Sequence, residues 1–262
     1  MMTDEPPRRP VHEPVLVREV IEALSPFPGG LFVDATTGLG GHARAVLEEV
    51  DGIAAFVGID RDGEMLAAAE GRLAYLPVPI ELVQGDFREL GRLVGEDRRG
   101  KVGGILFDLG VASPHLDRPE RGFSYRFGGA LDMRLDRSQE RSARDVVNGY
   151  SEEELERVIR TWGEERGARS IARAIVRSRE TAPIEDTGRL AEIVSSRLPE
   201  RWRTKGLSRV FQAIRIEVND EIGALEEGLA QAVDVLGPGG RLAVISYHSL
   251  EDRHVKEKLR EW

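Results

Sequence analysis

Residues 31–42 (LFVDATTGLGGH) constrain the fold more than any other part of the chain. A short apolar run ends at Asp34, and three glycines, Gly38, Gly40 and Gly41, then lead into a helical pattern. Glycine adopts positive φ at little cost and lets a ligand approach the backbone closely. The stretch therefore predicts a buried strand, a tight turn and the start of a helix.

A second apolar run, residues 53–59, ends at Asp60. In a Rossmann-type sheet, a glycine turn is followed by an acid at the end of the next strand, and that acid binds the ribose of a cofactor. We therefore expect a cofactor that contains a nucleoside, with Asp60 at its ribose.

The glycine spacing favours one cofactor over another. A dinucleotide turn has the pattern G-x-G-x-x-G, and the third glycine is absent here. Asp34 would repel a pyrophosphate, but it suits the sulfonium and ammonium charges of S-adenosylmethionine (SAM). The pattern favours SAM over NAD. For a lone glycine turn, the alternative is that the glycines only shape the connection between strand and helix.

Composition bounds the class of protein. The 262 residues are 40% hydrophobic and 32% charged, and this length suits one large domain or a domain with an insertion. No apolar run is long enough to span a membrane. Residues 1–11 are polar and proline-rich, so we expect disorder there and no secretory signal. There is no cysteine, which excludes disulfides and thiolate metal sites. We expect a cytoplasmic protein with no membrane partner.

Strand-like and helical patterns alternate in the first part of the chain, which predicts an α/β fold with a parallel sheet. The predicted strands are residues 31–35, 53–60, 80–84 and 104–109, with helices between them at 41–50, 63–73 and 87–94, after a first helix in 14–24.

From residue 111 to about 207 no strand is predicted, and helical patterns occur at 151–161, 164–178 and 187–198. One long helix is then expected from 207 to 236, a fifth strand at 241–246 and a last helix from Leu250. We expect a disordered segment (1–11), a cofactor-binding domain (12–112 and 206–262) and an inserted helical subdomain (113–205).

Charge is unevenly distributed. The net charge of −9 argues against an indiscriminate nucleic-acid binder. However, Arg166, Arg169, Arg173 and Arg177 recur at helical spacing and give one helix a basic face. Such a face can neutralise RNA phosphates without reading sequence. For a single helix, a solvated arginine face is the commoner explanation.

A metal site is not expected. The five histidines are scattered and show no ligand spacing; they are His12, His42, His115, His248 and His254.

Ten motifs in a fixed order extend along nearly the whole chain. They are HEPVL (12–16), DATTGLGGH (34–42), GIDRD (58–62), GILFDLGV (104–111), RGFSY (121–125), LDMR (131–134), GEER (163–166), IARAIV (171–176), FQAIRI (211–216) and HSLEDR (248–253). In this set and order, the chain resembles the bacterial RsmH (MraW) family. That family methylates N4 of a cytosine in 16S ribosomal RNA of the small subunit, using SAM.

The resemblance implies a class I SAM-dependent methyltransferase (Rossmann-like) sheet with a helical domain inserted after the fourth strand. It also implies that Gly40, Gly41 and His42 contact the methionine part of SAM, and that Asp60 binds the ribose. The remaining implied contacts are Asp86 and Phe87 at the adenine and Asp108 and His115 on the far side, where several relatives have glutamine instead of His115. With the glycine-turn residues, the predicted cofactor set is Asp34, Gly38, Gly40, Gly41, His42, Asp60, Asp86, Phe87, Asp108 and His115.

The chemistry of the implied substrate suggests catalytic residues. The N4 amino group is conjugated with its ring, so an acceptor that polarises its N–H bond assists transfer. DNA amino-methyltransferases often carry Asp/Asn-Pro-Pro-aromatic after strand four, where this chain has Asp108-Leu-Gly-Val. We expect Asp108 to be the acceptor; the alternative is that it only contacts SAM. His248 is a second candidate, and its alternative is a structural histidine hydrogen-bonded to Glu251 or Asp252.

A base must leave its stack to reach such a pocket. Phe123, Tyr125 and Phe127 are candidates to stack on it, although packing of their loop is the commoner explanation for aromatic residues.

The implied partner is 16S rRNA in the 30S subunit, and the oligomeric state is left open, a homodimer included. The family continues beyond this C-terminus through two further strands, so we expect a truncated chain with strand five at an exposed edge. Three rivals remain: a methyltransferase of another substrate, a NAD-dependent oxidoreductase, and a non-catalytic RNA-binding assembly factor.

Overall fold

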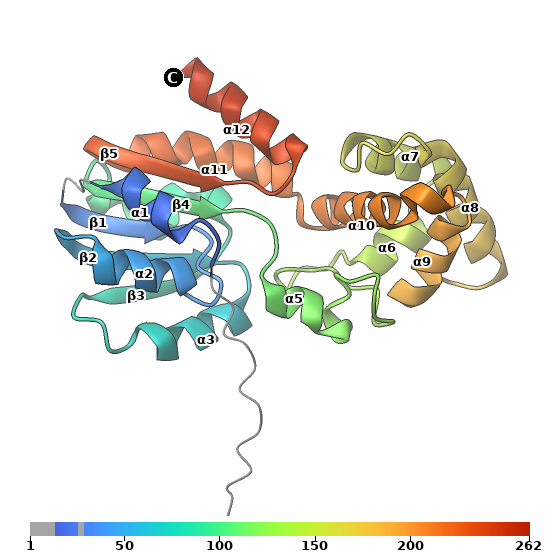
Figure 1. Cartoon of the computed structure of the whole chain (residues 1–262), viewed down its shortest axis with the longest axis horizontal. Helices are drawn as coiled ribbons and strands as arrows, with labels where there is room; N and C mark the ends of the chain where they lie inside the picture. The colour runs from blue at the N-terminus through green and yellow to red at the C-terminus, as the bar shows by residue number, and fades with distance from the viewer. Residues whose placement is uncertain (1–13, 26–28) are drawn as a thin grey trace, which may run out of the picture.

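The computed structural model describes residues 14–25 and 29–262, which form a sheet with helices on both faces and a group of helices beside it (Figure 1). The predicted disorder of residues 1–11 and His12 of the first motif lie outside the described residues. No helix among the described residues is long and apolar enough to cross a membrane.

The sheet has five parallel strands in the order β3-β2-β1-β4-β5. The strands are β1 (Gly30–Asp34), β2 (Ile53–Asp60), β3 (Ile80–Gln84), β4 (Val102–Asp108) and β5 (Leu236–Ile245). The chain moves outward from β1 to β3 and then returns to β4 on the other side of β1. Ligands of open α/β sheets bind at this reversal, beyond the carboxyl ends of the strands.

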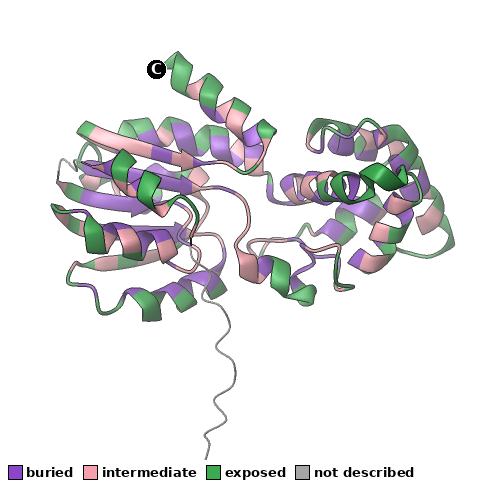
Figure 2. Ribbon diagram, in the orientation of Figure 1, coloured by how far each residue is buried: buried purple, intermediate pink, exposed green. Residues whose placement is uncertain are grey.

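Each face of the sheet is covered by helices, because successive side chains of a strand point to opposite sides. Phe32 and Phe56 pack with α1 (Val17–Leu24), α2 (Gly41–Glu49) and α3 (Gly63–Leu73) on one face. Val33 and Phe107 pack with α4 (Leu90–Val94), α11 (Glu221–Val235) and α12 (Ser249–Glu261) on the other. Figure 2 shows the buried residues concentrated in the three central strands, β2, β1 and β4, and on the inward sides of these helices.

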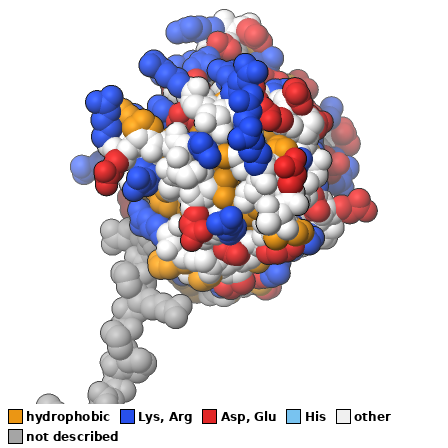
Figure 3. Space-filling view, turned by 90° about the vertical axis from the view of Figure 1, so that its right-hand side faces the viewer, with side chains coloured by type: hydrophobic (Ala, Val, Ile, Leu, Met, Phe, Trp, Pro, Cys, Tyr) orange, Lys and Arg blue, Asp and Glu red, His pale blue; other side chains and the backbone are white. Residues whose placement is uncertain are grey.

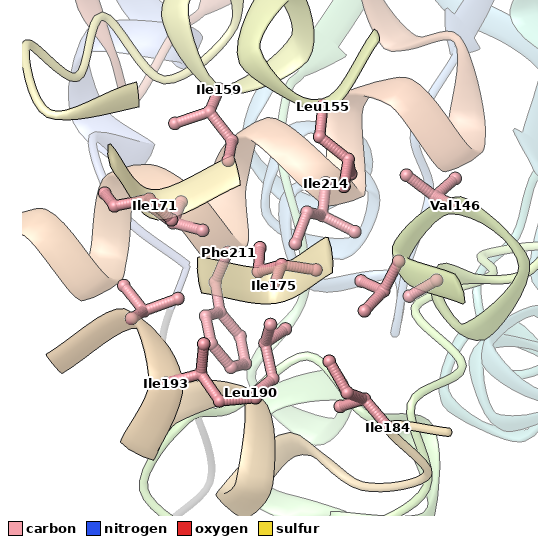
Figure 4. Packing of buried hydrophobic residues seen from close by; sticks show 14 of the residues in the cluster. Val146, Leu155, Ile159, Ile171, Ile175, Ile184, Leu190, Ile193, Phe211 and Ile214 are labelled. Atoms are coloured by element: carbon pink, nitrogen blue, oxygen red, sulfur yellow. The ribbon is translucent and has the colours of Figure 1, made fainter. Parts of the chain in front are cut away.

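The helices beside the sheet have a hydrophobic core of their own, drawn in Figure 4. These helices are α6 (Ala143–Gly149), α7 (Glu152–Thr161), α8 (Ala168–Thr181), α9 (Thr187–Ser195) and α10 (Arg203–Asn219). Ile171 and Ile175 of α8 meet Phe211 and Ile214 of α10 within this core. We call this group the helical part and the remainder the sheet part.

Of the helix starts predicted in the helical part, those at 151 and 187 lie within one residue of the starts of α7 and α9, whereas α8 begins four residues after the predicted start at 164. Ser151 caps α7 as its sequence indicates: the Glu154 backbone N–H donates to Ser151 Oγ (3.2 Å), and the Ser151 N–H donates to Glu154 Oε2 (2.7 Å). The short helix α5 (Ser113–Asp117) begins the connection from β4 to the helical part. The proposed division at residues 112/113 and 205/206 stays a prediction, and α10 crosses its second boundary.

The prediction of one helix from 207 to 236 is wrong. Two helices, α10 and α11, meet at Asp220, whose φ of 46° is left-handed and ends the first helix. Asp and Asn tolerate this conformation better than most residues. The Asn219 side chain stabilises the break, since its Nδ2 donates to the Met133 carbonyl (2.8 Å) and its Oδ1 accepts from Leu135 N–H (2.9 Å).

Two other elements differ in extent from the prediction. The fifth strand begins at Leu236, before the Gly-Pro-Gly-Gly sequence, and its pairing with β4 shifts register there. The helix expected at 87–94 is a 3₁₀ turn (Phe87–Glu89) followed by α4.

Candidate active site

A cavity of about 510 Å³ opens at the carboxyl ends of the strands, where the strand order reverses. This volume is typical of small-molecule sites. The predicted residues that line it are Gly38, Gly41, His42, Asp60, Phe87, Asp108, His115 and His248. Three other predicted residues, Asp34, Gly40 and Asp86, are not among the lining residues.

The glycine turn after β1 holds the carboxylate of Asp60. Gly38 has a φ of 53° and Gly40 a φ of 76°, both in the left-handed region that favours glycine. This turn aims the Gly38 N–H at Asp60 Oδ2 (2.7 Å), while the Asp62 N–H donates to Oδ1 (2.8 Å). Desolvation outweighs these bonds and raises the pKa of Asp60. The carboxylate is thus fixed at the cavity wall.

Asp108 lies at the end of β4 between a histidine and a tyrosine. His42 Nδ1 is 3.3 Å from Asp108 Oδ2, and the Tyr247 hydroxyl donates to Asp108 Oδ1 (2.9 Å). His42 Nε2 must donate to the Val15 carbonyl (2.7 Å), because a carbonyl only accepts. A favourable contact with Asp108 then requires a second proton on Nδ1.

The pKa of His42 agrees with that protonation. Burial lowers it, but the hydrogen bonds to Asp108 and to the Val15 carbonyl leave the pKa of His42 above its ordinary value. Burial and Asp108 together raise the pKa of Tyr247, so the phenol remains a donor. Asp108 is therefore oriented by two side chains, with His42 at one carboxyl oxygen and Tyr247 at the other.

Asp34 is buried behind the cavity wall. Burial raises the pKa of Asp34 to about 7, against the opposing effects of the Thr36 N–H (3.1 Å from Oδ1) and of His42. The nearby charges of Asp108 and Asp60 raise it further. A cation bound in the cavity would favour the ionised form of Asp34.

His115 belongs to a buried network rather than standing alone at the wall. Its Nδ1 accepts from the Ala112 N–H (3.1 Å), and its Nε2 donates to Asp62 Oδ2 (2.8 Å). Arg121 is only 1% exposed, and its guanidinium also contacts Asp62 Oδ2 (2.7 Å). Burial raises the pKa of Asp62, but the hydrogen bonds of His115 and Arg121 outweigh burial and hold this pKa well below its usual range.

Phe87 supplies an apolar wall. Its ring packs edge-on against Phe107, with centroids 5.4 Å apart, and Leu225 lies in the same cavity lining. Asp86 turns away to an ion pair with Arg61 (3.4 Å) and a hydrogen bond from Arg88 Nε (3.0 Å). Of this predicted pair, Phe87 alone reaches the cavity.

His248 caps α12. Its Nδ1 accepts from the Glu251 N–H (3.3 Å), and its Nε2 lies 3.1 Å from Glu251 Oε1. Glu251 is buried and also accepts from the Tyr247 N–H (3.0 Å). These contacts match the structural alternative for His248, although its side chain does reach the cavity wall.

Sequence reasoning missed several residues of the cavity. Arg215 and Glu221 form a two-pronged ion pair (2.8 Å for each contact) across the α10–α11 break, and both line the cavity with Gln212. Sequence reasoning did not find this pair because it predicted one continuous helix, which gives no reason to place either residue at the ends of the strands. Tyr247 was missed because nothing in its sequence surroundings marks its contact with Asp108.

The aromatic residues of the inserted loop mostly pack. Phe123 is buried against His115 (centroids 5.2 Å apart), and Tyr125 packs on Phe211 (5.6 Å). Phe127 is 50% exposed. None of the three is among the described residues that line the cavity.

The residues that line the first cavity are chemically suited to bind SAM. Carboxylates at Asp60 and Asp108, with Asp34 behind them, suit a cationic ligand and its ribose hydroxyls, and Phe87 and Leu225 suit an adenine ring. Within residues 14–25 and 29–262, no group of His, Asp and Glu is arranged to hold a metal ion.

Comparisons with known proteins show the family to which this chain belongs. Residues 9–262 match the model of the MraW methylase family. Proteins named ribosomal RNA small subunit methyltransferase H are 46% identical in Heliobacterium modesticaldum (95% of this chain and 81% of that protein) and 48% identical in Thermobifida fusca (96% and 78%). The protein of that name from Symbiobacterium thermophilum is 47% identical over 96% of this chain and 80% of its own length. This chain therefore belongs to the MraW methylase family.

Proposed function

We propose that this chain methylates the N4 amino group of a cytosine in 16S rRNA of the small ribosomal subunit, with SAM as the methyl donor. The relatives are named for methylation of small-subunit rRNA and match the chain over almost its whole length. We further infer a cytoplasmic location, where ribosomal subunits are found.

The observation that carries the proposal is the carboxylate of Asp108 at the cavity wall, oriented by His42 and Tyr247. SAM, when bound, supplies a methyl group on a sulfonium sulfur. Asp60 would hold the ribose hydroxyls, Phe87 would pack on the adenine, and the turn at Gly38–Gly41 leaves the backbone accessible to the methionine part.

Asp108 has capacity left for the substrate. A carboxylate offers about four lone-pair sites, and His42 and Tyr247 occupy two of them. A free site would accept a hydrogen bond from the amino group, which draws the nitrogen lone pair out of conjugation. Asp108 would then take the proton that the nitrogen loses on methylation.

His42 supports this role by its position, because its Nδ1 lies 3.3 Å from Asp108 Oδ2 and orients that carboxyl group at the cavity wall. The base must be unstacked to reach the cavity, as in other enzymes that modify bases. We propose His248 as a positioning residue, which caps α12 and holds the loop of Tyr247 through Glu251.

The test is the variant Asp108→Asn, which keeps the shape but removes the charge and the proton acceptor. We expect kcat to fall about 10²- to 10⁴-fold, the usual effect of losing a general base. SAM binding should change much less, and calorimetry on the same sample measures it. A variant with wild-type kcat would remove Asp108 from the chemistry, leaving it as a contact of SAM alone.

A further inference from the structure

A second cavity lies in the helical part, away from the strand ends. Its volume is about 450 Å³, and arginines dominate its lining. Four of them extend along α8 and the residues just before it, and the fifth follows α9; they are Arg166, Arg169, Arg173, Arg177 and Arg197. From Arg169 to Arg177 the helix rises about 12 Å, so the cations form a row.

Most of these arginines are free of carboxylates. Arg173 Nε donates to Glu152 Oε1 (3.2 Å). Among the acidic residues that the structure describes, none lies within ion-pairing distance of Arg166, Arg169, Arg177 or Arg197. All five side chains are exposed. In the sheet part, by contrast, Arg88 contacts three carboxylates.

Four of the five arginines in this row thus have no carboxylate partner among the described residues, although the chain has a net charge of −9. Like charges repel unless an anion neutralises them, and the concave surface concentrates their field. Figure 3 looks onto the end of the molecule that the helical part forms, and Lys and Arg side chains gather over part of that face. Guanidinium groups bind phosphate oxygens in a two-pronged geometry through charge-assisted hydrogen bonds.

One helix, α10, extends from the arginine-lined cavity to the first cavity. Leu207, Val210 and Phe211 of α10 pack in the core beneath α8, and Gln212 and Arg215 of the same helix line the first cavity. Arg209 of α10 also lies 3.4 Å from Glu165, just before the arginine row. An RNA held at α8 would therefore be held in a fixed relation to the cavity that receives the base.

We propose that the arginine-lined cavity binds backbone phosphates of the RNA substrate, outside the target nucleotide. This inference rests on the proposed function, since it takes the rRNA as the ligand. The row contributes affinity and orientation and does not read sequence, because phosphates carry no sequence information.

The test compares two double variants with the same change in net charge. Arg169→Gln with Arg177→Gln removes two members of the row. Arg18→Gln with Arg260→Gln removes two exposed arginines of α1 and α12, in the sheet part, that have no carboxylate partner among the described residues either. Binding to 30S subunits that lack the N4 methyl group is measured from 50 to 200 mM KCl, with SAM affinity and thermal unfolding as controls.

Each phosphate contact contributes about 0.7 to the slope of log K against log salt for single-stranded nucleic acid. We expect the row variant to lower that slope by about 1.4 and to weaken binding about 20-fold at 0.1 M salt. Its KM for the subunit should rise, with kcat and SAM affinity unchanged. The variant of α1 and α12 should keep the wild-type slope.

Equal slopes for the two variants, with a wild-type chain that binds and methylates, would overturn the phosphate site and leave the proposed function standing. A wild-type chain that neither binds nor methylates the subunits would overturn both.

Discussion

The burial of Asp34 beside the first cavity predicts a pH dependence of cofactor binding. Burial raises the pKa of Asp34 to about 7, so near neutral pH this residue is partly protonated. SAM carries positive charge, so it favours the ionised form. Its affinity should therefore rise as pH increases from 6 to 8, with release of a proton from Asp34 on binding.

His42, Asp108 and Asp60 are the charged groups that act on Asp34, and His42 loses its proton in the same direction of pH. Calorimetry in buffers of different ionisation enthalpy measures the proton release. The variant Asp34→Asn should flatten most of the dependence. If the affinity of the wild-type chain for SAM stays constant from pH 6 to 8, the charge of bound SAM does not change the ionisation of Asp34.

The buried contact between Arg121 and Asp62 predicts a large effect on stability. Arg121→Met leaves Asp62 Oδ2 with His115 as its side-chain partner, and removing one side of a buried ion pair costs about 3–5 kcal/mol. We expect the free energy of unfolding, measured with urea, to fall by about 3 kcal/mol. Arg118→Met is the control, since Arg118 and Glu64 form an exposed pair (2.7 Å) worth under about 1 kcal/mol.

The stabilisation from Asp62 also has a pH window. The pKa of Asp62 is lowered in the folded chain, so its contribution is complete above the unfolded value near 4. It is lost as pH falls through the lower folded value. The difference in stability between the wild-type chain and Arg121→Met should accordingly shrink below about pH 4; a constant difference would place the effect of Arg121 elsewhere.

At the scale of elements, the junction of α10 and α11 sets the position of the helical part against the cavity. Asn219 is 1% exposed and ties this junction to Met133 and Leu135. Asn219→Ala should cost about 2 kcal/mol, because buried polar partners are left unsatisfied. It should also weaken SAM binding several-fold, because Arg215 and Glu221 flank the junction and line the cavity.

Asn148→Ala is the matched control for that junction. Asn148 makes equivalent bonds with the backbone of Ile184, within the helical part (2.9 and 2.8 Å). It should lower stability by a similar amount and leave the Kd for SAM unchanged. Equal effects of the two variants on SAM binding would show that the junction has no special part in shaping the cavity.

Helices and strands with a clear hydrophobic pattern could be predicted from the sequence. Bounds that depend on contacts with distant parts of the chain could not. The predicted bounds of β2 and β3 match the structure, because their apolar runs end at turn residues. The break at Asp220 was not predictable, because the apolar pattern continues through it. It depends on partners at Met133 and Leu135, more than 80 residues earlier in the chain.

At the scale of the whole molecule, the sequence predicted the α/β class, the glycine turn and the acid at Asp60 from local pattern alone. Those features recur wherever a parallel sheet binds a nucleoside. Tyr247 and the Arg215–Glu221 pair could not be found in this way, since their roles exist only after α10, α11 and β5 meet at the strand ends. The spacing of the arginines was visible in the sequence. Only the structure shows that they line a concave surface and that most of them have no carboxylate partner among the described residues.

The most direct test of the proposed function is transfer of a tritiated methyl group from SAM to 30S subunits that lack cytosine-N4 methylation, followed by nucleoside analysis of the rRNA. We expect label in N4-methylcytidine with the wild-type chain and loss of that label with Asp108→Asn. Binding of SAM without any label in N4-methylcytidine would contradict the proposed function.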